Sequence, residues 1–397
     1  MSCLSYLLIA VLVFLGVPAQ CADEPLEDLL RADSIDCVMS AAVASGLING
    51  GTVLIGNRSA DLFVRNYGTV SSADHSPPVK LDTVFDLASL TKVIATTPSI
   101  MKLVDEGRLN LLDPVTKWFP EFAGKGKDNL LVLHLLTHTS GIGDFSVSSC
   151  NLLQGIVEVA ANRELAWAPG TKFKYADINF ILLGELVRRV SGRELALYAR
   201  ENIFLPLGMG DTAFNPGEDL RVRCAATIDI SNNLLFGTVQ DPGARFLGGV
   251  AGHAGVFGTA ADLSRFCRML LRGGELSGTR ILSAGAFRQM TTPYSIQDGK
   301  VIRAVGWDMV SPFSAPRGAG FSGSSFGHTG YSGCSVWIDP ESDLYVILLT
   351  SRRDYRRTGD FKRLRSSIST LAAALFSNGK NRRQCRENAA GTVRQKT

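Results

Sequence analysis

Two Ser-x-x-Lys tetrads are the part of the sequence best suited to chemistry: Ser89 with Lys92, and Ser99 with Lys102. Residues three apart lie on the same face of a helix, so each Lys amine would lie beside its Ser hydroxyl. A serine hydroxyl is a weak nucleophile until a neighbouring base removes its proton. The tetrad therefore predicts a serine nucleophile that a lysine activates.

Position along the predicted helix separates the two tetrads. Ser89 follows the strand-like segment 83–86 and lies where the helix begins, whereas Ser99 lies ten residues further along. The N-terminus of a helix provides free N–H groups and a positive potential, and both stabilise an oxyanion. A lysine that acts as a base near neutral pH also needs a pKa about three units below its usual value, which burial and the local field must supply. We therefore predict that Ser89 and Lys92 react, and that Ser99 and Lys102 are a chance match.

Other polar motifs each lack a residue that their chemistry needs. His134 and His138 share a helix face, but Leu135 stands where a zinc protease has its glutamate. The glycine-rich segment 248–255 lacks the lysine of a phosphate-binding loop, and 330–334 lacks the last glycine of a G-x-S-x-G elbow. The cysteines of the body show no metal-ligand spacing. The sequence therefore predicts neither a metal nor a cofactor.

The elements that must position these residues are strands near both ends of the chain and helices between them. Short apolar runs bounded by turn residues predict strands at 51–56, 62–68, 304–310, 334–339 and 344–350. Apolar stripes that end at glycines predict helices at 27–45, 89–106, 179–190, 260–271 and 361–376.

This order of elements predicts an α/β fold of the α+β type. A mostly antiparallel sheet, flanked by the terminal helices, would be built from both ends of the chain and interrupted by a mainly helical domain. We assign residues 22–110 and 293–378 to the sheet-containing domain and residues 111–292 to the helical domain.

The two ends of the chain differ from its body. Residues 4–17 form an apolar run that is shorter than the roughly 20 residues of a membrane-spanning helix. We predict a secretory signal peptide at 1–21, with an uncleaved membrane anchor as the alternative, and a periplasmic or extracellular protein without a membrane span after processing. The basic tail at 379–397 accounts for the net charge of +4, so the body has no basic excess and nucleic-acid binding is not expected.

Two further motifs follow residues 89–92 in chain order: Tyr-Ala-Asp at 175–177 and His-Thr-Gly at 328–330. The three motifs resemble the S-x-x-K, Y-x-N and K-T-G or H-T-G elements of the serine β-lactamase and penicillin-binding-protein superfamily, in its class C β-lactamase-like branch. The resemblance extends from about residue 51 to 350 and implies a β-lactamase/transpeptidase-like fold. It is greatest to exported enzymes assigned by sequence as D-alanyl-D-alanine carboxypeptidases or peptidoglycan amidases, which also match at 135–141, 206–209 and 249–255.

This resemblance implies a role for each motif residue. Ser89 would attack the substrate carbonyl and form an acyl-enzyme, while Lys92 and Tyr175 together act as the general base. The backbone N–H groups of Ser89 and Tyr331 would form the oxyanion hole. Asp177 would orient Lys92 and the substrate amide. The far wall of the site would be lined by His328, Thr329 and Gly330.

Two residues depart from the family pattern. Asp177 stands where the pattern has asparagine, and its charge could hold Lys92 protonated and shift the role of base towards Tyr175. His328 replaces the commoner lysine, so the charge at that wall depends on pH. A neutral imidazole suits a substrate carboxylate less than a fixed cation does, which keeps both ester and amide substrates open.

The sequence thus predicts an exported serine hydrolase without metal or cofactor. The expected substrate is a small, cell-wall-derived amide such as a D-alanyl peptide or a muropeptide. A carboxylesterase on the same scaffold and a slowly acylating penicillin-binding sensor are the alternatives.

Overall fold

A computed structural model of the chain describes residues 33–147, 152–296, 299, 301–311 and 317–377. The signal peptide predicted at 1–21 and the basic tail at 379–397 lie outside the described residues, as does the first part of the helix predicted at 27–45. None of the helices in this described part is long and apolar enough to cross a membrane.

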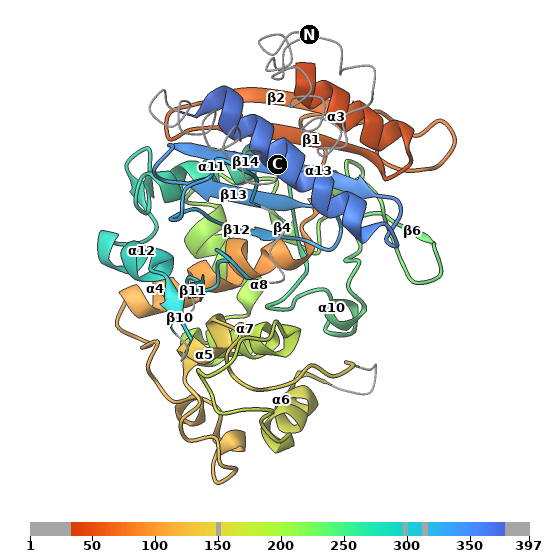
Figure 1. Cartoon of the computed structure of the whole chain (residues 1–397). Coiled ribbons are helices and arrows are strands. Elements are labelled where there is room, and N and C mark those ends of the chain that lie inside the picture. Colours follow the sequence, from red (N-terminus) through yellow and green to blue (C-terminus); the bar gives the residue numbers. More distant parts are fainter. Residues whose placement is uncertain (1–32, 148–151, 297–298, 300, 312–316, 378–397) are drawn as a thin grey trace, which may run out of the picture.

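A five-stranded sheet, antiparallel between all neighbours, is built from both ends of the chain (Figure 1). Its strands in spatial order are β12 (Phe326–Thr329), β13 (Ser335–Asp339), β14 (Leu344–Arg352), β1 (Ile48–Gly56) and β2 (Asp61–Gly68). The two longest strands, β1 and β14, are buried along their whole length, which explains their continuous apolar runs. The sheet confirms the predicted fold class.

Helices cover both faces of this sheet. On one face α3 (Asp33–Ala44) and α13 (Thr358–Phe376) lie side by side (Figure 1). Between them and the sheet is an apolar core that includes Met39, Trp337 and Leu348. On the other face α11 (Ala260–Leu271), whose bounds are those predicted for a helix, packs against β1 and β14.

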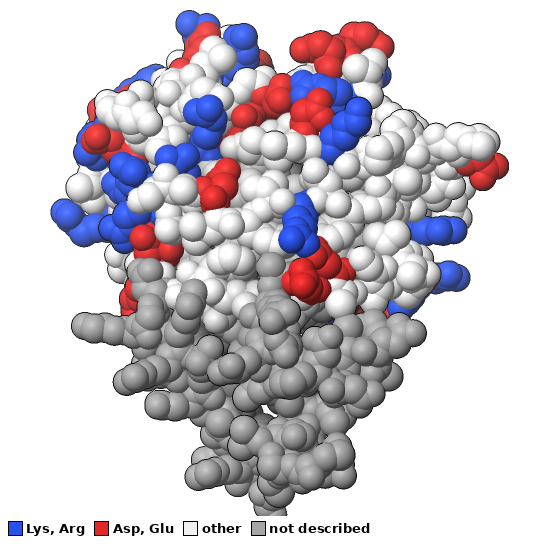
Figure 2. Space-filling model, turned by 90° about the horizontal axis from the view of Figure 1, so that it is seen from above, with Lys and Arg blue, Asp and Glu red and all other residues white. Residues whose placement is uncertain are grey.

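The surface over α3, α13 and β2 carries mixed charge. Figure 2 shows basic and acidic side chains interspersed on this face. At the start of α13, both Arg357 and Arg363 pair with Asp360, and Arg65 of β2 pairs with Asp36 of α3. Among the described residues of this face, charges of both signs therefore alternate.

The chain between β2 and β12 forms a mainly helical part below the sheet in Figure 1. Besides α11, its described α-helices are α4 (Thr97–Asp105), α5 (Val132–Leu136), α6 (Leu153–Asn162), α7 (Asp177–Ser191), α8 (Leu195–Ala199), α9 (Glu218–Arg221), α10 (Pro242–Phe246) and α12 (Ala284–Thr291). A second sheet has the order β3 (Phe85–Asp86), β7 (Val256–Gly258), β4 (Ala213–Phe214). The remaining short strands pair as β5 (Thr227–Ile228) with β6 (Leu234–Leu235), β8 (Glu275–Leu276) with β9 (Thr279–Arg280), and β10 (Tyr294–Ser295) with β11 (Val301–Arg303).

The helix predicted at 89–106 is present, but its pitch changes along its length. A 3₁₀ turn (Ala88–Leu90) leads to a π-helical turn (Lys92–Thr96), and α4 continues from there. Ala88, the residue before Ser89, has a φ of +45°, which non-glycine residues rarely adopt. Departures of this kind from regular helix are frequent at functional sites, and here they contain both members of the first tetrad.

The strand predicted at 304–310 is wrong. The extended residues are those of β11, and Asp308 forms only isolated bridges. Gly306 has a φ of +78° and lies so close to Thr97 that a Cβ atom there would be 2.1 Å from its Oγ1. This left-handed turn against α4 interrupts the apolar run before it can form a strand.

α7 and the glycine-rich segment 249–255 approach each other backbone to backbone. At Gly184 of α7 a Cβ atom would lie 2.9 Å from the nitrogen of Gly252, and at Gly252 it would lie 1.9 Å from the carbonyl oxygen of Phe180. The hydroxyl of Thr96 also donates to the Gly252 carbonyl oxygen at 2.7 Å. These contacts fix how far the segment lies from the start of α7.

Gly252→Ala is expected to lower the free energy of unfolding by about 1–3 kcal/mol, because the added methyl group meets backbone atoms that move only if α7 shifts. Gly210→Ala is the matched control, since nothing lies within 4 Å of a Cβ atom there. Urea unfolding of both variants measures the difference, and equal stabilities would contradict the close contact.

Candidate active site

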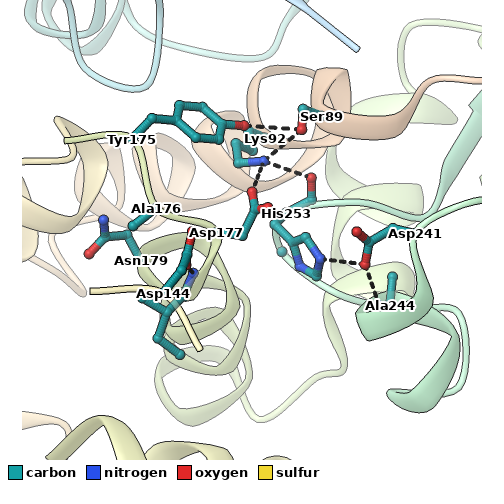
Figure 3. Close-up of polar contacts among 12 residues, drawn as sticks. Ser89, Lys92, Asp144, Tyr175, Ala176, Asp177, Asn179, Asp241, Ala244 and His253 are labelled. Atoms are coloured by element: carbon teal, nitrogen blue, oxygen red, sulfur yellow. Dashed lines mark hydrogen bonds and ion pairs between the residues drawn. The ribbon is translucent and has the colours of Figure 1, made fainter. Parts of the chain in front are cut away.

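Three side chains predicted to react meet at one hydroxyl (Figure 3). Lys92 Nζ lies 2.9 Å from Ser89 Oγ, and the Tyr175 hydroxyl donates to the same oxygen at 3.0 Å. Lys92 Nζ also lies 5.0 Å from the centre of the Tyr175 ring. Ser89 and Lys92 come from the turns before α4, and Tyr175 comes from the loop that leads into α7. The arrangement can take a proton from the serine and return it to a leaving group.

The Lys92 side chain is fully buried, so its ammonium depends on protein partners. Besides Ser89, Nζ contacts Asp177 Oδ1 at 2.7 Å and donates to the carbonyl oxygen of His253 at 3.0 Å. Asp177 is the first residue of α7, and His253 lies in the segment that packs on that helix. The ammonium thus donates hydrogen bonds to the oxygens of Ser89 and His253 and forms an ion pair with the Asp177 carboxylate.

Asp177 determines the charge of Lys92. Burial lowers the pKa of Lys92, but the adjacent Asp177 carboxylate, together with Tyr175, outweighs burial and raises that pKa above its usual value. For Asp177 itself, burial opposes ionisation, yet Lys92 holds the pKa of the carboxyl below its usual range. Burial raises the pKa of Tyr175, against the Lys92 charge. At neutral pH the site therefore holds an ammonium, a carboxylate and a neutral phenol, and the pKa of Lys92 moves opposite to the direction that a lysine base needs.

His138 supports the ring of Tyr175. The two rings are stacked with their centroids 4.4 Å apart, and His138 Nδ1 accepts the backbone N–H of Ala176 at 3.2 Å. Burial lowers the pKa of His138 well below its usual value, and the charge of Arg303 adds to this effect. A neutral imidazole leaves Nδ1 free to accept. His138 thereby fixes the loop that carries Tyr175.

His328, on β12, forms the opposite wall. Its ring centroid lies 6.1 Å from that of Tyr175, and its Nδ1 lies 2.9 Å from the carbonyl oxygen of Thr329. Burial, with the charges of Arg303 and Lys92, lowers the pKa of His328 well below its usual value. The imidazole at this wall is therefore neutral at neutral pH.

The turn after β12 packs against the turn that carries Ser89. Gly330 donates its N–H to the Cys334 carbonyl oxygen at 2.7 Å, and a Cβ atom on Gly330 would lie 2.5 Å from the Leu87 carbonyl oxygen. Tyr331 follows with its side chain 57% exposed. The structure thus brings the predicted residues of this turn to the nucleophile, with the Tyr331 side chain at the surface.

The second tetrad has other partners. Ser99 Oγ is fully buried and donates to the carbonyl oxygen of Ala95 at 2.7 Å, whereas Lys102 Nζ pairs with Glu106 at 3.5 Å. Within the described ranges, no group of three or more His, Cys, Asp and Glu side chains could hold a metal ion.

Two acidic residues near the site were not predicted. Asp241 Oδ1 lies 2.9 Å from His253 Nε2 and accepts the N–H of Ala244, so that it also caps α10. Asp86 is 2% exposed and accepts the N–H of Ala88, directly before the nucleophile. Asp241 precedes a proline, which is a helix-start signal in the sequence, and Asp86 lies in a short apolar strand, where a carboxylate is unusual. Neither signal points to a site until the distant partners are known.

A cavity of about 440 Å³ opens beside Asp177. Its lining combines three carboxylates with a histidine and apolar side chains, among them Asp144, Asp177, Asp241, His253, Ile178 and Ile181. Asp177 also contacts Lys92, which in turn contacts Ser89, so the cavity wall is linked to the nucleophile through that lysine. This side of the site is therefore negatively charged.

Sequence comparison places the chain among hydrolases. The family model described as Beta-lactamase matches residues 38–367. A protein of Escherichia coli (strain K12) named "Putative D-alanyl-D-alanine carboxypeptidase" is 30% identical over 310 residues, which cover 69% of this chain and 71% of that protein. A protein of the same name from Escherichia coli O157:H7 is 28% identical over 361 residues and covers 81% of this chain and 82% of its own.

Solved structures share the fold. A penicillin-binding protein homolog from Caulobacter crescentus superposes with a TM-score of 0.69 at 22% identity, covering 84% of this chain and 95% of that chain. Simvastatin synthase from Aspergillus terreus superposes with a TM-score of 0.70 at 20% identity, covering 87% of this chain and 98% of that chain. A protein described as a hydrolase with promiscuous acyltransferase activity superposes with a TM-score of 0.68 at 20% identity, covering 87% of this chain and 100% of that chain. Because the family model matches most of the sequence and the fold agrees with it, the chain belongs to the Beta-lactamase family.

Proposed function

We propose that the chain is a serine hydrolase that forms an acyl-enzyme on Ser89. The observation that carries this proposal is the convergence of the Lys92 amine and the Tyr175 hydroxyl on Ser89 Oγ, at 2.9 and 3.0 Å. A nucleophile within hydrogen-bond reach of its base is what covalent catalysis by serine requires. Membership of the Beta-lactamase family and relatives named as carboxypeptidases support a hydrolase.

The reactive form is the one in which the Lys92–Tyr175 pair has lost one proton, since only that form can accept the proton of Ser89. Asp177 keeps Lys92 as an ammonium, so we assign the missing proton to Tyr175, whose phenolate the ammonium then stabilises. This assignment makes Tyr175 the general base and Lys92 its electrostatic partner.

In the proposed reaction Ser89 Oγ bonds to the substrate carbonyl carbon while its proton moves to the Tyr175 oxygen. The backbone N–H groups of Ser89 and Tyr331 stabilise the resulting oxyanion, each contribution being of the order of 3 kcal/mol. The C–N or C–O bond then breaks, and Tyr175 passes the proton to the leaving amine or alcohol. Water attacks the acyl-enzyme in the same manner, which releases the acid and restores Ser89.

As substrate we propose a peptidoglycan-derived amide, such as a D-alanyl peptide or a muropeptide. The names of the Escherichia coli relatives support this class. The signal peptide predicted at 1–21 would bring the protein to the compartment where such amides occur. The three carboxylates of the cavity beside Asp177 repel a substrate carboxylate and favour a neutral or amine-bearing part of the peptide there.

A carboxylesterase is the second candidate, and the neutral His328 favours it. A cation at this wall would attract the terminal carboxylate of a D-alanyl-D-alanine peptide, whereas a neutral imidazole offers no such attraction. An uncharged ester does not need that charge.

Labelling tests the nucleophile. After incubation with an activated phosphonate or a β-lactam, mass spectrometry is expected to find the adduct on the peptide that contains Ser89. Ser89→Ala should abolish the adduct, and Ser99→Ala, which alters the second tetrad, should retain it. Label that persists in Ser89→Ala would refute the proposal, and an adduct that survives for hours without turnover would identify a sensor instead of a hydrolase.

The pH dependence tests the role of Asp177. Its charge raises the pKa of both Lys92 and Tyr175, so Asp177→Asn should lower both values. The rising limb of log kcat/KM against pH is therefore expected to move to lower pH, whichever group holds the missing proton. An unchanged limb, or one displaced to higher pH, would contradict the assigned electrostatics.

Substrate comparison separates the two candidate functions. Purified protein is expected to release amine fragments from muropeptides, identified by mass, and to hydrolyse a p-nitrophenyl ester as well. Both activities should vanish in Ser89→Ala, because one nucleophile performs both. Ester turnover without any cleaved muropeptide would favour the esterase.

A further inference from the structure

Asp86 joins three segments that are far apart in the sequence. It ends β3, three residues before Ser89, and is only 2% exposed. Its Oδ1 accepts the N–H of Ala88 at 2.8 Å, and its Oδ2 accepts the N–H of Gln240 at 2.7 Å. The first bond closes the turn that presents the nucleophile. The second bond ties that turn to the loop that leads to Asp241.

The side-chain bonds of Asp86 hold a strained backbone. Ala88 has a φ of +45°, a conformation that costs a non-glycine residue of the order of 1–3 kcal/mol unless its surroundings impose it. The bond from the Ala88 N–H to Asp86 Oδ1 is such a constraint, and Ser89 is the next residue along the chain. The direction of the Ser89 N–H and Oγ thus depends on this turn.

The turn after β12 forms hydrogen bonds with the main chain of Asp86. Its carbonyl oxygen accepts the Ser332 hydroxyl at 2.6 Å and the Cys334 thiol at 3.4 Å. Gly330 in the same turn lies against the Leu87 carbonyl oxygen, so that a Cβ atom there would be 2.5 Å away. The two turns that would supply the oxyanion hole therefore meet at Asp86 and Leu87.

We propose that Asp86 is a positioning residue whose ionised carboxylate holds the Ser89 turn in the place that the oxyanion hole requires, against the turn after β12. This inference rests on the proposed acyl transfer at Ser89. Asp86 does not touch the reacting atoms. Its side chain acts through the backbone N–H groups of Ala88 and Gln240, whereas its main-chain carbonyl oxygen binds Ser332 and Cys334.

Ionisation matters because both carboxyl oxygens of Asp86 face N–H donors. A protonated carboxyl would place its own O–H against one of them, so that either the Ala88 or the Gln240 bond is lost. Burial raises the pKa of Asp86 to about 6, although the Gln240 and Ala88 N–H groups lower it. Protonation is therefore expected just below neutral pH.

The titratable and charged groups that face Asp86 do not produce the same transition. The charge of Asp241 adds to the rise in the pKa of Asp86, and Arg245 opposes it more weakly. The pKa of Asp241 itself is lowered to about 2, so it stays ionised. The remaining neighbours have a pKa raised by burial and stay neutral in this range: Cys224, Cys334 and Tyr355.

Asp86→Asn tests the proposal, because an amide places an N–H group against one donor just as the protonated acid does. Hydrolysis of a p-nitrophenyl ester by the full chain is measured from pH 5 to 9, with kcat and KM separated. We expect kcat to fall about 10- to 100-fold at pH 8, with KM changed much less, because transition-state stabilisation is lost while substrate contacts stay.

The pH profile distinguishes positioning from mere stability. Wild type is expected to lose activity more steeply below about pH 6, where Asp86 takes up a proton, in addition to the limb of Tyr175. Asp86→Asn should lack this extra loss. The matched control is Asp262→Asn: Asp262 is also buried, has a pKa raised by burial and accepts the N–H of Asp211 at 2.8 Å, yet it contacts neither turn of the site. It should keep both the kcat and the profile of wild type.

Each outcome bears on one of the two proposals. If Ser89→Ala is inactive while Asp86→Asn retains the wild-type kcat and the steeper loss below pH 6, the inference about Asp86 is overturned and the proposed function stands. If Ser89→Ala keeps full activity, the proposed function fails first. If Asp86→Asn does not fold, as judged by circular dichroism, Gln240→Pro is the second variant. It removes the second N–H donor to Asp86, together with the bond from the Gln240 side chain to the Ile228 carbonyl oxygen, and Gln240→Ala, which removes only the side-chain bond, is its control. Gln240→Pro, but not Gln240→Ala, must abolish the extra loss below pH 6 for the inference to hold.

Discussion

A lysine ammonium with no exposed surface is the constraint on which the site depends. Removing an ion from water costs several kcal/mol unless protein groups replace the lost hydration. For Lys92 the replacements are the Asp177 carboxylate, the His253 carbonyl oxygen and the Ser89 hydroxyl. They come from three distant parts of the chain, so the fold must hold all three parts together. The contact between Gly184 and Gly252 fixes two of them relative to each other.

Lys92 carries the positive charge that contacts the nucleophile. The two imidazoles that flank Tyr175, His138 and His328, are kept neutral because burial lowers their pKa, and the charge of Arg303 adds to this effect. Asp177 balances the ammonium, and a proton lost from Tyr175 leaves a negative oxygen 3.0 Å from Ser89 Oγ. In the proposed mechanism these tasks are separated: Lys92 carries the charge, Tyr175 moves the proton, and Ser89 forms the bond.

The sequence predicted what depends on local spacing and missed what depends on distant contacts. The i, i+3 relation of Ser89 and Lys92 and the apolar periodicity of α11 are local, and both patterns were readable. Tyr175 and the residues of β12 came from the resemblance alone. The segment 304–310, wrongly predicted as a strand, turns at Gly306, which packs against Thr97. The role proposed for Asp86 depends on its hydrogen bonds with Gln240 and Ser332. Such partners cannot be recognised from a neighbourhood of a few residues.

The division of the sheet between the two ends of the chain also divides the candidate site. β1 pairs with β14, and the turn after β12 packs against the turn that carries Ser89, so both contacts join an early segment of the chain to a late one. In the proposed mechanism, a polypeptide that ends before β12 has only one of the two N–H groups of the oxyanion hole. The proposed acyl transfer on Ser89 therefore requires segments from both ends of the sheet.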